Sequence, residues 1–290
     1  MRAFREYHPL VNFTYFAAVI LFAMFFMHPI FLAIALVSSV CYMMLLKGRS
    51  AFRFQFSLIM PIFLIAAITN PLFNHEGMTV LTYFPNGNPL TLESIMYGAA
   101  AGAMLISVIC WFSCVHEIMT SDKIIYLFGR IMPSLSLIFS MTLRFVPRFR
   151  QQLAVISASQ RALGRDASSG GMIQRAKNGI KIFSVMVTWA LENAVETADS
   201  MKSRGYGLSG RTAFSVFRFN GRDAYAMVYL LLLSGYVLLS CLVGVANFTY
   251  FPSVQMVGQN LWTVSVFLAY FLLCAMPAGI EIWEVKKWRL

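Results

Sequence analysis

The sequence predicts an all-α polytopic membrane protein with about six transmembrane helices and a cytoplasmic helical insert between the fourth and the fifth. Apolar residues make up 59% of the chain and charged residues only 12%, whereas about a quarter of an ordinary soluble domain is charged. Several uncharged runs reach the roughly 20 residues that a helix needs to cross a bilayer. Basic residues concentrate between two of these runs. The chain therefore needs a lipid bilayer as its main partner.

Four uncharged segments supply the predicted spans. In chain order they are residues 10–46, 54–73, 94–116 and 224–280. His28-Pro29 interrupts the first segment near its middle, which predicts a tight hairpin of two short spans. A polar stretch from Asn247 to Asn260 divides the last segment into two more. Because the first span leads directly into a second and no small-residue cleavage site follows it, we expect it to be retained rather than removed as a signal peptide.

The charge distribution predicts how the chain is oriented. Residues 121–222 contain 15 lysines and arginines against 5 acidic residues, whereas residues 74–93 and 249–260 contain no lysine or arginine. The protein is expected in the inner membrane of a bacterium. Because connections rich in basic residues stay in the cytoplasm, the insert and both termini are expected on the cytoplasmic side. The other basic residues agree: Arg2, Arg5, Lys47, Arg49, Arg53, Lys286, Lys287 and Arg289.

Three regions follow from these boundaries: an N-terminal membrane region (1–116), the insert (117–223) and a C-terminal membrane region (224–290). The apolar part of the insert from Ile131 to Leu143 is too short to cross a bilayer and is expected at the membrane interface or under the helix bundle. The basic charge of the insert suits an anionic membrane surface or an acidic protein. Nucleic acid is disfavoured, since no zinc-ligand spacing, helix-turn-helix or aromatic strand pattern is present.

Two long helices are predicted in the insert. One runs from about Arg144 to Gly164, with Pro147 in its first turn, where proline is tolerated. The other runs from about Gly171 to Arg204, and Gly205 supplies the left-handed residue that closes it. Its apolar residues recur at three- and four-residue spacing: Ile180, Phe183, Val187, Leu191, Ala194, Ala198 and Met201. Both helices end in a basic residue beside a glycine, which suits docking to a partner, although such residues also cap helices or meet lipid phosphates.

Several kinds of chemistry are disfavoured by the residues. Cys110 and Cys114 are spaced like a helical metal pair, but no third ligand has suitable spacing, so no metal or other cofactor is expected. The segment from Gly205 to Thr212 resembles a phosphate-binding loop, but it follows a polar helix rather than a buried strand, and Arg211 replaces the lysine. Since no acidic residue lies in the middle of a span, an ion-coupled transporter and a membrane enzyme are both disfavoured.

The sequence of the insert resembles that of a known family of membrane proteins. The runs SLSLIFSMTLRFVPRFRQQLAVISASQRALGRD and TWALENAVETADSMKSRGYGLSGRT are similar to the coupling region of the transmembrane component of energy-coupling factor transporters, the family that includes the cobalt-transport permease. The N-terminal YHPLVNFTYF resembles the opening of the same family. The resemblance implies that an arginine at each helix tip seats in a groove of an ABC ATPase subunit. On that basis, Ser203, Arg204 and Gly205 form the second docking triplet.

The first triplet departs from the family pattern. It reads Ala162, Leu163 and Gly164, with leucine where the family has arginine. Arg161 or Arg165 is a candidate replacement, because a guanidinium binds a carboxylate in bidentate fashion. A leucine that docks as an apolar knob is the other possibility.

The resemblance implies a non-enzymatic coupling subunit, with ATP hydrolysis in two partner ATPase subunits. A substrate-binding membrane subunit would take up a vitamin or a transition-metal ion. Gly98 and Gly102 form a small-residue face that either packs within this protein or receives that subunit. The alternatives are a self-sufficient secondary transporter and another kind of ABC permease.

Overall fold

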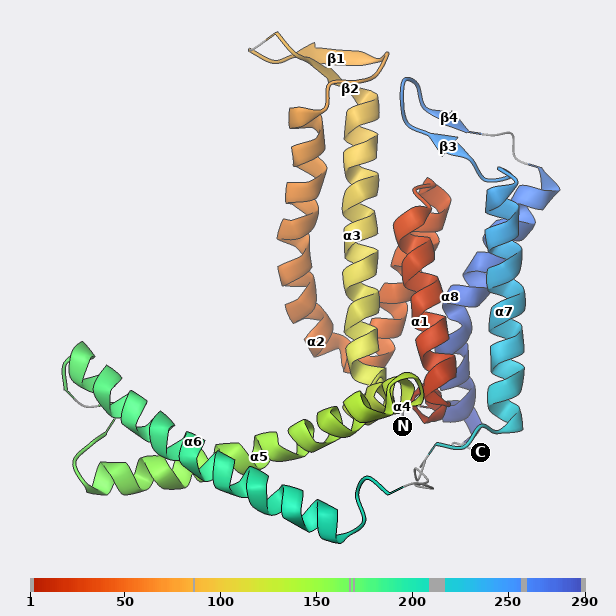
Figure 1. Ribbon diagram of the computed structural model, residues 1–290. Helices are drawn as coiled ribbons and strands as arrows, with labels where there is room; N and C mark the ends of the chain where they lie inside the picture. The colour runs from red at the N-terminus through yellow and green to blue at the C-terminus, as the bar shows by residue number, and fades with distance from the viewer. Residues whose placement is uncertain are drawn as a thin grey trace. The chain divides into compact units, whose positions relative to one another are not determined.

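The computed structural model (Figure 1) describes residues 3–85, 87–166, 168, 170–208, 217–256 and 260–287. It is mostly helical, with two small antiparallel sheets. The elements in chain order are the 3-10 helix η1 (Ala3–Glu6), α1 (Pro9–Phe25), α2 (Pro29–Phe73), β1 (Val80–Tyr83), β2 (Pro89–Thr91), α3 (Leu92–Ile118), α4 (Ser121–Ile131), α5 (Pro133–Ala162), α6 (Met172–Ser203), α7 (Gly221–Leu242), β3 (Phe248–Thr249), β4 (Gln255–Met256) and α8 (Leu261–Lys287).

The chain divides into two compact units. Unit 1 comprises Met1–Ile124 and Phe217–Leu290, and unit 2 comprises Ile125–Val216. Unit 1 contains the apolar helices, and unit 2 contains the two long helices α5 and α6.

The apolar helices of unit 1 correspond to the predicted spans. Four of them are long and apolar enough to cross a membrane: Pro29–Gly48, Leu92–Ile118, Gly221–Leu242 and Leu261–Glu284. Two shorter apolar helices, Pro9–Phe25 and Ile59–Phe73, occupy the positions of the other predicted spans. The prediction of an all-α polytopic membrane protein is confirmed.

Helices α1 and α2 begin in the same way. In each, a histidine precedes a proline at the first helical position, and its Nδ1 atom accepts a hydrogen bond of 3.2 Å from the backbone N–H two residues later. Proline suits this position because the N–H that it lacks would have no partner in the helix. Since α1 ends at Phe25 and α2 begins at Pro29, the hairpin predicted at His28-Pro29 is confirmed.

A bend at Gly48 separates the second predicted span from the third. Gly48 has φ 77° and ψ 172° within α2, a left-handed conformation that favours glycine. Next to the bend, the Lys47 ammonium group donates a hydrogen bond of 2.6 Å to the Ser113 hydroxyl of α3. The connection between these two spans is thus helical apart from the bend at Gly48, and it is not a loop.

The sequence predicts no strand, yet the two loops without lysine and arginine each form a short hairpin, β1–β2 and β3–β4. All four residues of β1 are exposed, so its side chains show no alternation that sequence could reveal. The Glu93 carboxylate at the start of α3 accepts a 2.6 Å hydrogen bond from the Thr79 hydroxyl. The backbone N–H of Met78 donates to the Pro252 carbonyl at 3.1 Å, which joins the two loops.

An aromatic core holds the helices of unit 1 together. The rings of Tyr15 in α1 and Trp111 in α3 meet edge to face at 6.0 Å between centroids. Phe31 of α2 and Tyr270 of α8 meet in the same way at 5.0 Å. The Tyr15 hydroxyl also donates to the Cys274 carbonyl at 3.1 Å, which joins α1 to α8. Such ring pairs contribute about 0.5–1.5 kcal/mol each beyond the area they bury.

Unit 1 also contains a buried polar cluster, which we call the N-terminal anchor: the side chains of Asn12, Lys123, Asp223 and Glu281 around the backbone of residues 3–8. Lys123 is 4% exposed, and its ammonium group donates to the backbone carbonyls of Arg5 and Tyr7. In the amide orientation that satisfies both groups, the Asn12 oxygen accepts from Lys123 at 2.6 Å and its nitrogen donates to the Phe4 carbonyl at 3.2 Å.

Two carboxylates complete the N-terminal anchor. Asp223 at the start of α7 accepts a 3.0 Å hydrogen bond from the backbone N–H of His8. Glu281 in α8 accepts one of 3.0 Å from the N–H of Ala3. Buried backbone groups cost free energy when they lack a partner. The anchor therefore ties η1 to the ends of helices that are far apart in the sequence.

Because Lys123 is buried, the free energy of unfolding should depend on pH. Burial lowers the pKa of the Lys123 amine to about 8 from its ordinary 10.5. Between these values the unfolded lysine keeps a proton that the native lysine has lost, so the free energy of unfolding rises with pH. We expect wild type to gain thermal stability relative to Lys123→Met between pH 8 and pH 10.5 in detergent. Parallel curves for the two proteins over this range would contradict the assignment.

Helix α5 begins earlier than predicted. Its first residue is Pro133, and Pro147 lies inside the helix rather than in its first turn. The segment Ile131–Leu143, which is predicted to be too short to cross a bilayer, comprises the last residue of α4, Met132 and the first third of α5. An interior proline removes one helical hydrogen bond and costs about 3 kcal/mol. The other hydrogen bonds of this 30-residue helix and its packing against α6 offset this cost.

Helix α6 agrees with its prediction. It runs from Met172 to Ser203, with Gly171 as its N-cap and Arg204 as its C-cap. Gly205 has φ 79°, which confirms it as the left-handed residue that closes the helix.

Candidate functional site

The carboxyl ends of α5 and α6 have the same geometry. Leu163 and Arg204 are the two C-cap residues, and both have φ −85° and ψ 9°. Gly164 follows with φ 71° and Gly205 with φ 79°. Both ends are Schellman motifs, in which the two residues after the cap donate their backbone N–H groups to the last turn of the helix. Figure 1 shows the two ends at opposite extremes of unit 2.

The hydrogen bonds of the two motifs match one to one. In α5, Gly164 N–H donates to the Arg161 carbonyl at 2.9 Å, and the next N–H donates to the Gln160 carbonyl at 2.9 Å. In α6, Gly205 N–H donates to the Lys202 carbonyl at 2.9 Å, and the next N–H donates to the Met201 carbonyl at 3.0 Å. Leu163 therefore occupies the place of Arg204, and Arg161 occupies the place of Lys202. Ala162 and Ser203 also correspond.

The side chain of Arg161 is held by its own loop. It forms an ion pair of 3.2 Å with the Asp166 carboxylate. Asp166 also accepts from the Ser168 hydroxyl at 2.5 Å, and that hydrogen bond is the main reason why its pKa lies below the ordinary value. The Asp166 carbonyl accepts a 2.8 Å hydrogen bond from the side chain of Asn178 in α6. Both Leu163, which is 67% exposed, and the Arg161 side chain, which is 71% exposed, are accessible at this end of α5.

Arg165 stands beyond the turn. Its backbone N–H belongs to the Schellman motif, and its side chain is exposed. Because Gly164 reverses the chain direction, Arg165 corresponds to Tyr206 and not to Arg204. By backbone position, Arg161 corresponds to Lys202 and Arg165 to Tyr206.

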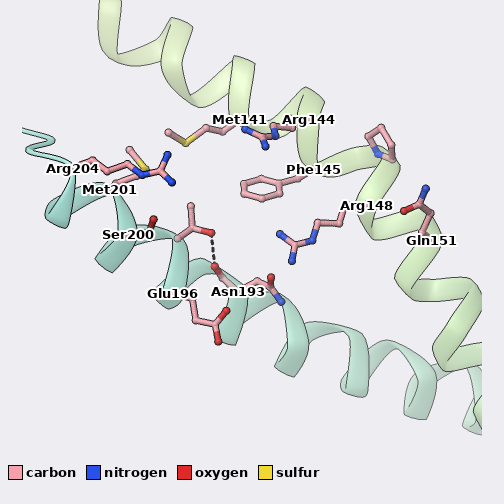
Figure 2. A pocket seen from close by; sticks show the side chains of 12 residues that line it. Met141, Arg144, Phe145, Arg148, Gln151, Asn193, Glu196, Ser200, Met201 and Arg204 are labelled. Carbon is pink, nitrogen blue, oxygen red and sulfur yellow. Dashed lines mark hydrogen bonds between the residues drawn. The ribbon is translucent and has the colours of Figure 1, made fainter.

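A cleft lies between α5 and α6 and contains Arg204. It has a volume of about 750 Å³, and its basic lining residues are Arg144, Arg148 and Arg204. Figure 2 shows Arg204 of α6 and Arg148 of α5 reaching into the space between the two helices, with the Phe145 ring beside them. Glu196 is the acidic residue of the lining.

The electrostatics of this cleft favour an anionic ligand. Arg148 lies over the Trp189 ring, 5.5 Å from its centroid. Among the residues that the structure describes, Arg144 and Arg204 form no ion pair. Like charges around one cavity repel one another, and a carboxylate that enters between them relieves the repulsion and accepts bidentate hydrogen bonds. The cleft can therefore bind an acidic side chain of a partner.

Sequence reasoning did not identify Arg144 and Arg148 as site residues. Their spacing of four places both on one face of a helix, and this is the signal that could have found them. The signal was hidden because the helix was expected to begin at Arg144, where both residues would lie in its first turns. The observed start at Pro133 places them in the middle of α5.

Gly98 and Gly102 lie in unit 1, buried on α3 against α2 of the same chain. A Cβ atom on Gly98 would stand 2.6 Å from the Ala67 carbonyl oxygen, and one on Gly102 would stand 2.6 Å from the Phe63 ring. An apolar groove of about 550 Å³ borders this contact, with Ile65, Phe73 and Leu105 in its lining.

A larger side chain at residue 102 should separate α2 from α3. Gly102→Leu would have to displace Phe63, and such overpacking costs typically 1–3 kcal/mol. We expect a lower thermal unfolding temperature in detergent, measured by intrinsic fluorescence. Gly179→Leu on α6 is the matched control, because nothing lies within 4 Å of a Cβ atom there. Equal stability of the two variants would show that the close approach is not required.

The structure also describes the cysteine pair and part of the segment that resembles a phosphate-binding loop. Cys110 and Cys114 are buried on α3, and the described residues contain no group of three or more His, Cys, Asp or Glu side chains that could hold a metal ion. The segment that resembles a phosphate-binding loop follows helix α6, not a strand. Only its part from Gly205 to Leu208 belongs to the described residues, and Arg211 lies outside them. Arg2 and Arg289 also lie outside them.

Comparison with known proteins gives consistent matches. The family model described as cobalt transport protein (CbiQ) matches residues 4–214. An energy-coupling factor transporter transmembrane protein EcfT of Lactobacillus helveticus is 36% identical over 106 residues, which cover 36% of this chain and 38% of that protein. The protein of the same name from Listeria innocua is 28% identical over 236 residues, covering 76% of this chain and 87% of that protein. The one from Bacillus subtilis is 33% identical over 101 residues. Except for the Listeria innocua match, these alignments span about two fifths of the relatives' length.

Proposed function

Since the chain belongs to the cobalt transport protein family, we propose that it is the transmembrane coupling subunit of an energy-coupling factor importer. In this role it transmits the movement of two cytoplasmic ABC ATPase subunits to a substrate-binding membrane subunit. The substrate is a vitamin or a transition-metal ion. The chain itself performs no catalysis and needs no cofactor.

The observation that supports this proposal most is the matched pair of helix ends in unit 2. Both C-caps are exposed residues that precede a left-handed glycine, so each rigid helix ends in an accessible side chain. A side chain on a rigid element transmits force, whereas one on a loop would yield. The α6 tip carries Arg204 at the edge of the cationic cleft, where it can bind a carboxylate of an ATPase subunit.

The proposed mechanism is mechanical. The two ATPase subunits close when they bind ATP, and the grooves that hold the ends of α5 and α6 move with them. The helices follow, and the membrane helices tilt. The substrate-binding subunit then reorients and releases its substrate inside the cell. Docking of the insert requires a cytoplasmic location, in agreement with the basic charge of residues 121–222.

Two apolar surfaces are available for the substrate-binding subunit or for lipid. One is the groove between α2 and α3 beside Gly98 and Gly102. The other is the face of α6 where Ile180, Phe183 and Leu191 are at least 64% exposed. In soluble proteins, a contiguous exposed apolar surface marks an interaction site. By the same reasoning, these two surfaces suit contact with lipid or with an apolar membrane protein.

Purification from the native membrane tests the proposal. The tagged chain should recover two proteins with ABC ATPase sequences, together with a small apolar membrane protein, identified by mass spectrometry, and the preparation should hydrolyse ATP. If the chain purifies alone and transports substrate without ATP in liposomes, it is a self-sufficient transporter and the proposal is wrong.

A further inference from the structure

Two covalent connections join unit 2 to unit 1. The chain leaves unit 1 after Ile124 and returns to it at Phe217. We call residues 121–124 the first root of the insert and residues 217–223 the second. Each root contains a buried charged residue: Lys123 is 4% exposed and Asp223 is 2% exposed. Since lysine and aspartate are almost never fully buried unless they are paired, their partners show what holds the roots in place.

A single peptide group of the N-terminal segment joins the two roots. Its carbonyl oxygen, which belongs to Tyr7, accepts a hydrogen bond of 3.3 Å from the Lys123 ammonium group. Its N–H, which belongs to His8, donates a hydrogen bond of 3.0 Å to the Asp223 carboxylate. Because a peptide group is planar and rigid, it keeps these two side chains at a fixed separation, although they are far apart in the sequence.

The second root makes further contacts with the same peptide. The Arg222 guanidinium lies over the Tyr7 ring, 4.4 Å from its centroid, and the rings of Phe219 and His8 meet edge to face at 5.2 Å. A cation over an aromatic ring contributes a favourable electrostatic attraction. Asp223 also belongs to the capping box of α7. One carboxylate therefore fixes both the start of a membrane helix and the N-terminal segment.

The N-terminal segment is itself part of the core of unit 1. The N–H of Ala3 donates to the Glu281 carboxylate of α8 at 3.0 Å. The Phe4 ring is fully buried and lies 5.3 Å from the Tyr15 ring of α1. Helix α1 begins at Pro9, directly after the segment. Movement of either root relative to α1 and α8 would therefore break buried hydrogen bonds, which is unfavourable.

We infer that the N-terminal anchor is the joint through which movement of unit 2 enters the membrane helices, and that Lys123 and Asp223 are positioning residues for this coupling. While the anchor is intact, the two roots move as one body together with the ends of α1 and α8. If the anchor is loosened, the same movement of unit 2 separates the roots and is lost before it reaches the membrane helices. The inference rests on the proposed function and concerns residues that contact no ATPase subunit in it.

The separation of the two roots during ATP binding tests the inference. Spin labels on genetically encoded residues replace Asp122 and Tyr225, which are exposed and lie at the two roots. Pulsed electron paramagnetic resonance then measures their distance in the complex with its ATPase subunits, with and without trapped ATP. We expect a narrow distance distribution in wild type that is the same in both states. A wild-type distance that shifts when ATP binds overturns the inference.

Two conservative variants loosen the anchor. Asp223→Asn keeps one acceptor oxygen, and Lys123→Met keeps the length of the side chain. Loss of a hydrogen bond to a charged group shifts an equilibrium by about ten-fold or more. In both variants the distribution should broaden and should shift when ATP binds, whereas the rate of ATP hydrolysis stays within about two-fold of wild type, because distant sites act independently. Distributions as narrow as in wild type, and unchanged by ATP, overturn the inference.

Glu93→Gln is the matched control. Glu93 is a carboxylate with 1% exposure that accepts a 3.2 Å hydrogen bond from the backbone N–H of Thr79, at the end of α3 opposite the first root. This variant loses the same charge and should keep the wild-type distribution. Equal broadening in Glu93→Gln would show a general loss of stability and overturns the inference. If wild type recovers no ATPase subunit, the proposed function itself fails, whereas a complex that hydrolyses ATP but fails the distance test contradicts only the role of the anchor.

Discussion

Arg204→Glu is expected to release the ATPase subunits from the purified complex. Removal of one partner of a buried, hydrogen-bonded charge pair costs about 2–5 kcal/mol, and charge reversal adds repulsion. This corresponds to a loss of affinity of at least about 30-fold. The introduced carboxylate would also pair with Arg144 or Arg148 and fill the cleft that is meant for the partner. Recovery of ATPase subunits and ATP hydrolysis by the preparation should both fall to background.

Lys202→Glu is the matched control for this variant. Lys202 is exposed on the same last turn of α6, and it does not line the cleft. The charge change is identical, so a loss due only to long-range electrostatics would appear in both variants. Arg204→Lys should give an intermediate loss, because lysine keeps the charge but not the planar bidentate fork. Full recovery of ATPase subunits with Arg204→Glu would exclude Arg204 as the docking contact.

Asp223→Ala is expected to produce the largest loss of stability in unit 1. Asp223 is 2% exposed, and its carboxylate accepts 3.0 Å hydrogen bonds from the backbone N–H groups of His8 and Asn220. It also forms the capping box of α7 with Asn220. Loss of these partners costs about 2–4 kcal/mol. For a unit of this size, the unfolding temperature should fall by about 4–16 °C.

Asp199→Ala serves as the control for Asp223→Ala, since Asp199 is an exposed acid of α6 in unit 2. It should change the unfolding temperature in detergent by no more than about 2 °C, because exposed substitutions usually shift stability by less than about 0.5 kcal/mol. Asp223→Asn retains one acceptor oxygen and should lie between the two. An unfolding temperature of Asp223→Ala equal to that of wild type would show that the N-terminal anchor does not stabilise unit 1.

The spans and helix α6 could be predicted from the sequence because their signals are local. Uncharged runs report burial in lipid without reference to any other part of the chain. Likewise, the apolar spacing of α6 and the glycine at residue 205 lie within one continuous segment. The closure of α5 at Gly164 was predicted for the same reason, and its φ of 71° confirms it.

The start of α5 could not be predicted from local signals because two of them conflict. Pro133 and Pro147 both fit a first helical turn, and the residues between them are apolar enough for a separate segment. Packing of α5 against α6 decides between them, and this contact is not visible in the sequence. The N-terminal anchor was missed for a related reason. Lys123, Asp223 and Glu281 are unremarkable singly, and only the fold brings them to one place.

The distance between the tips of α5 and α6 in the assembled complex tests the central claim most directly. Spin labels on genetically encoded residues at positions 162 and 203 allow this distance to be measured by pulsed electron paramagnetic resonance, with and without trapped ATP. Since the helix ends follow the ATPase subunits as they close, the distance distribution should shift to shorter values when ATP binds. An unchanged distribution in a complex that hydrolyses ATP would contradict the coupling role of these helices.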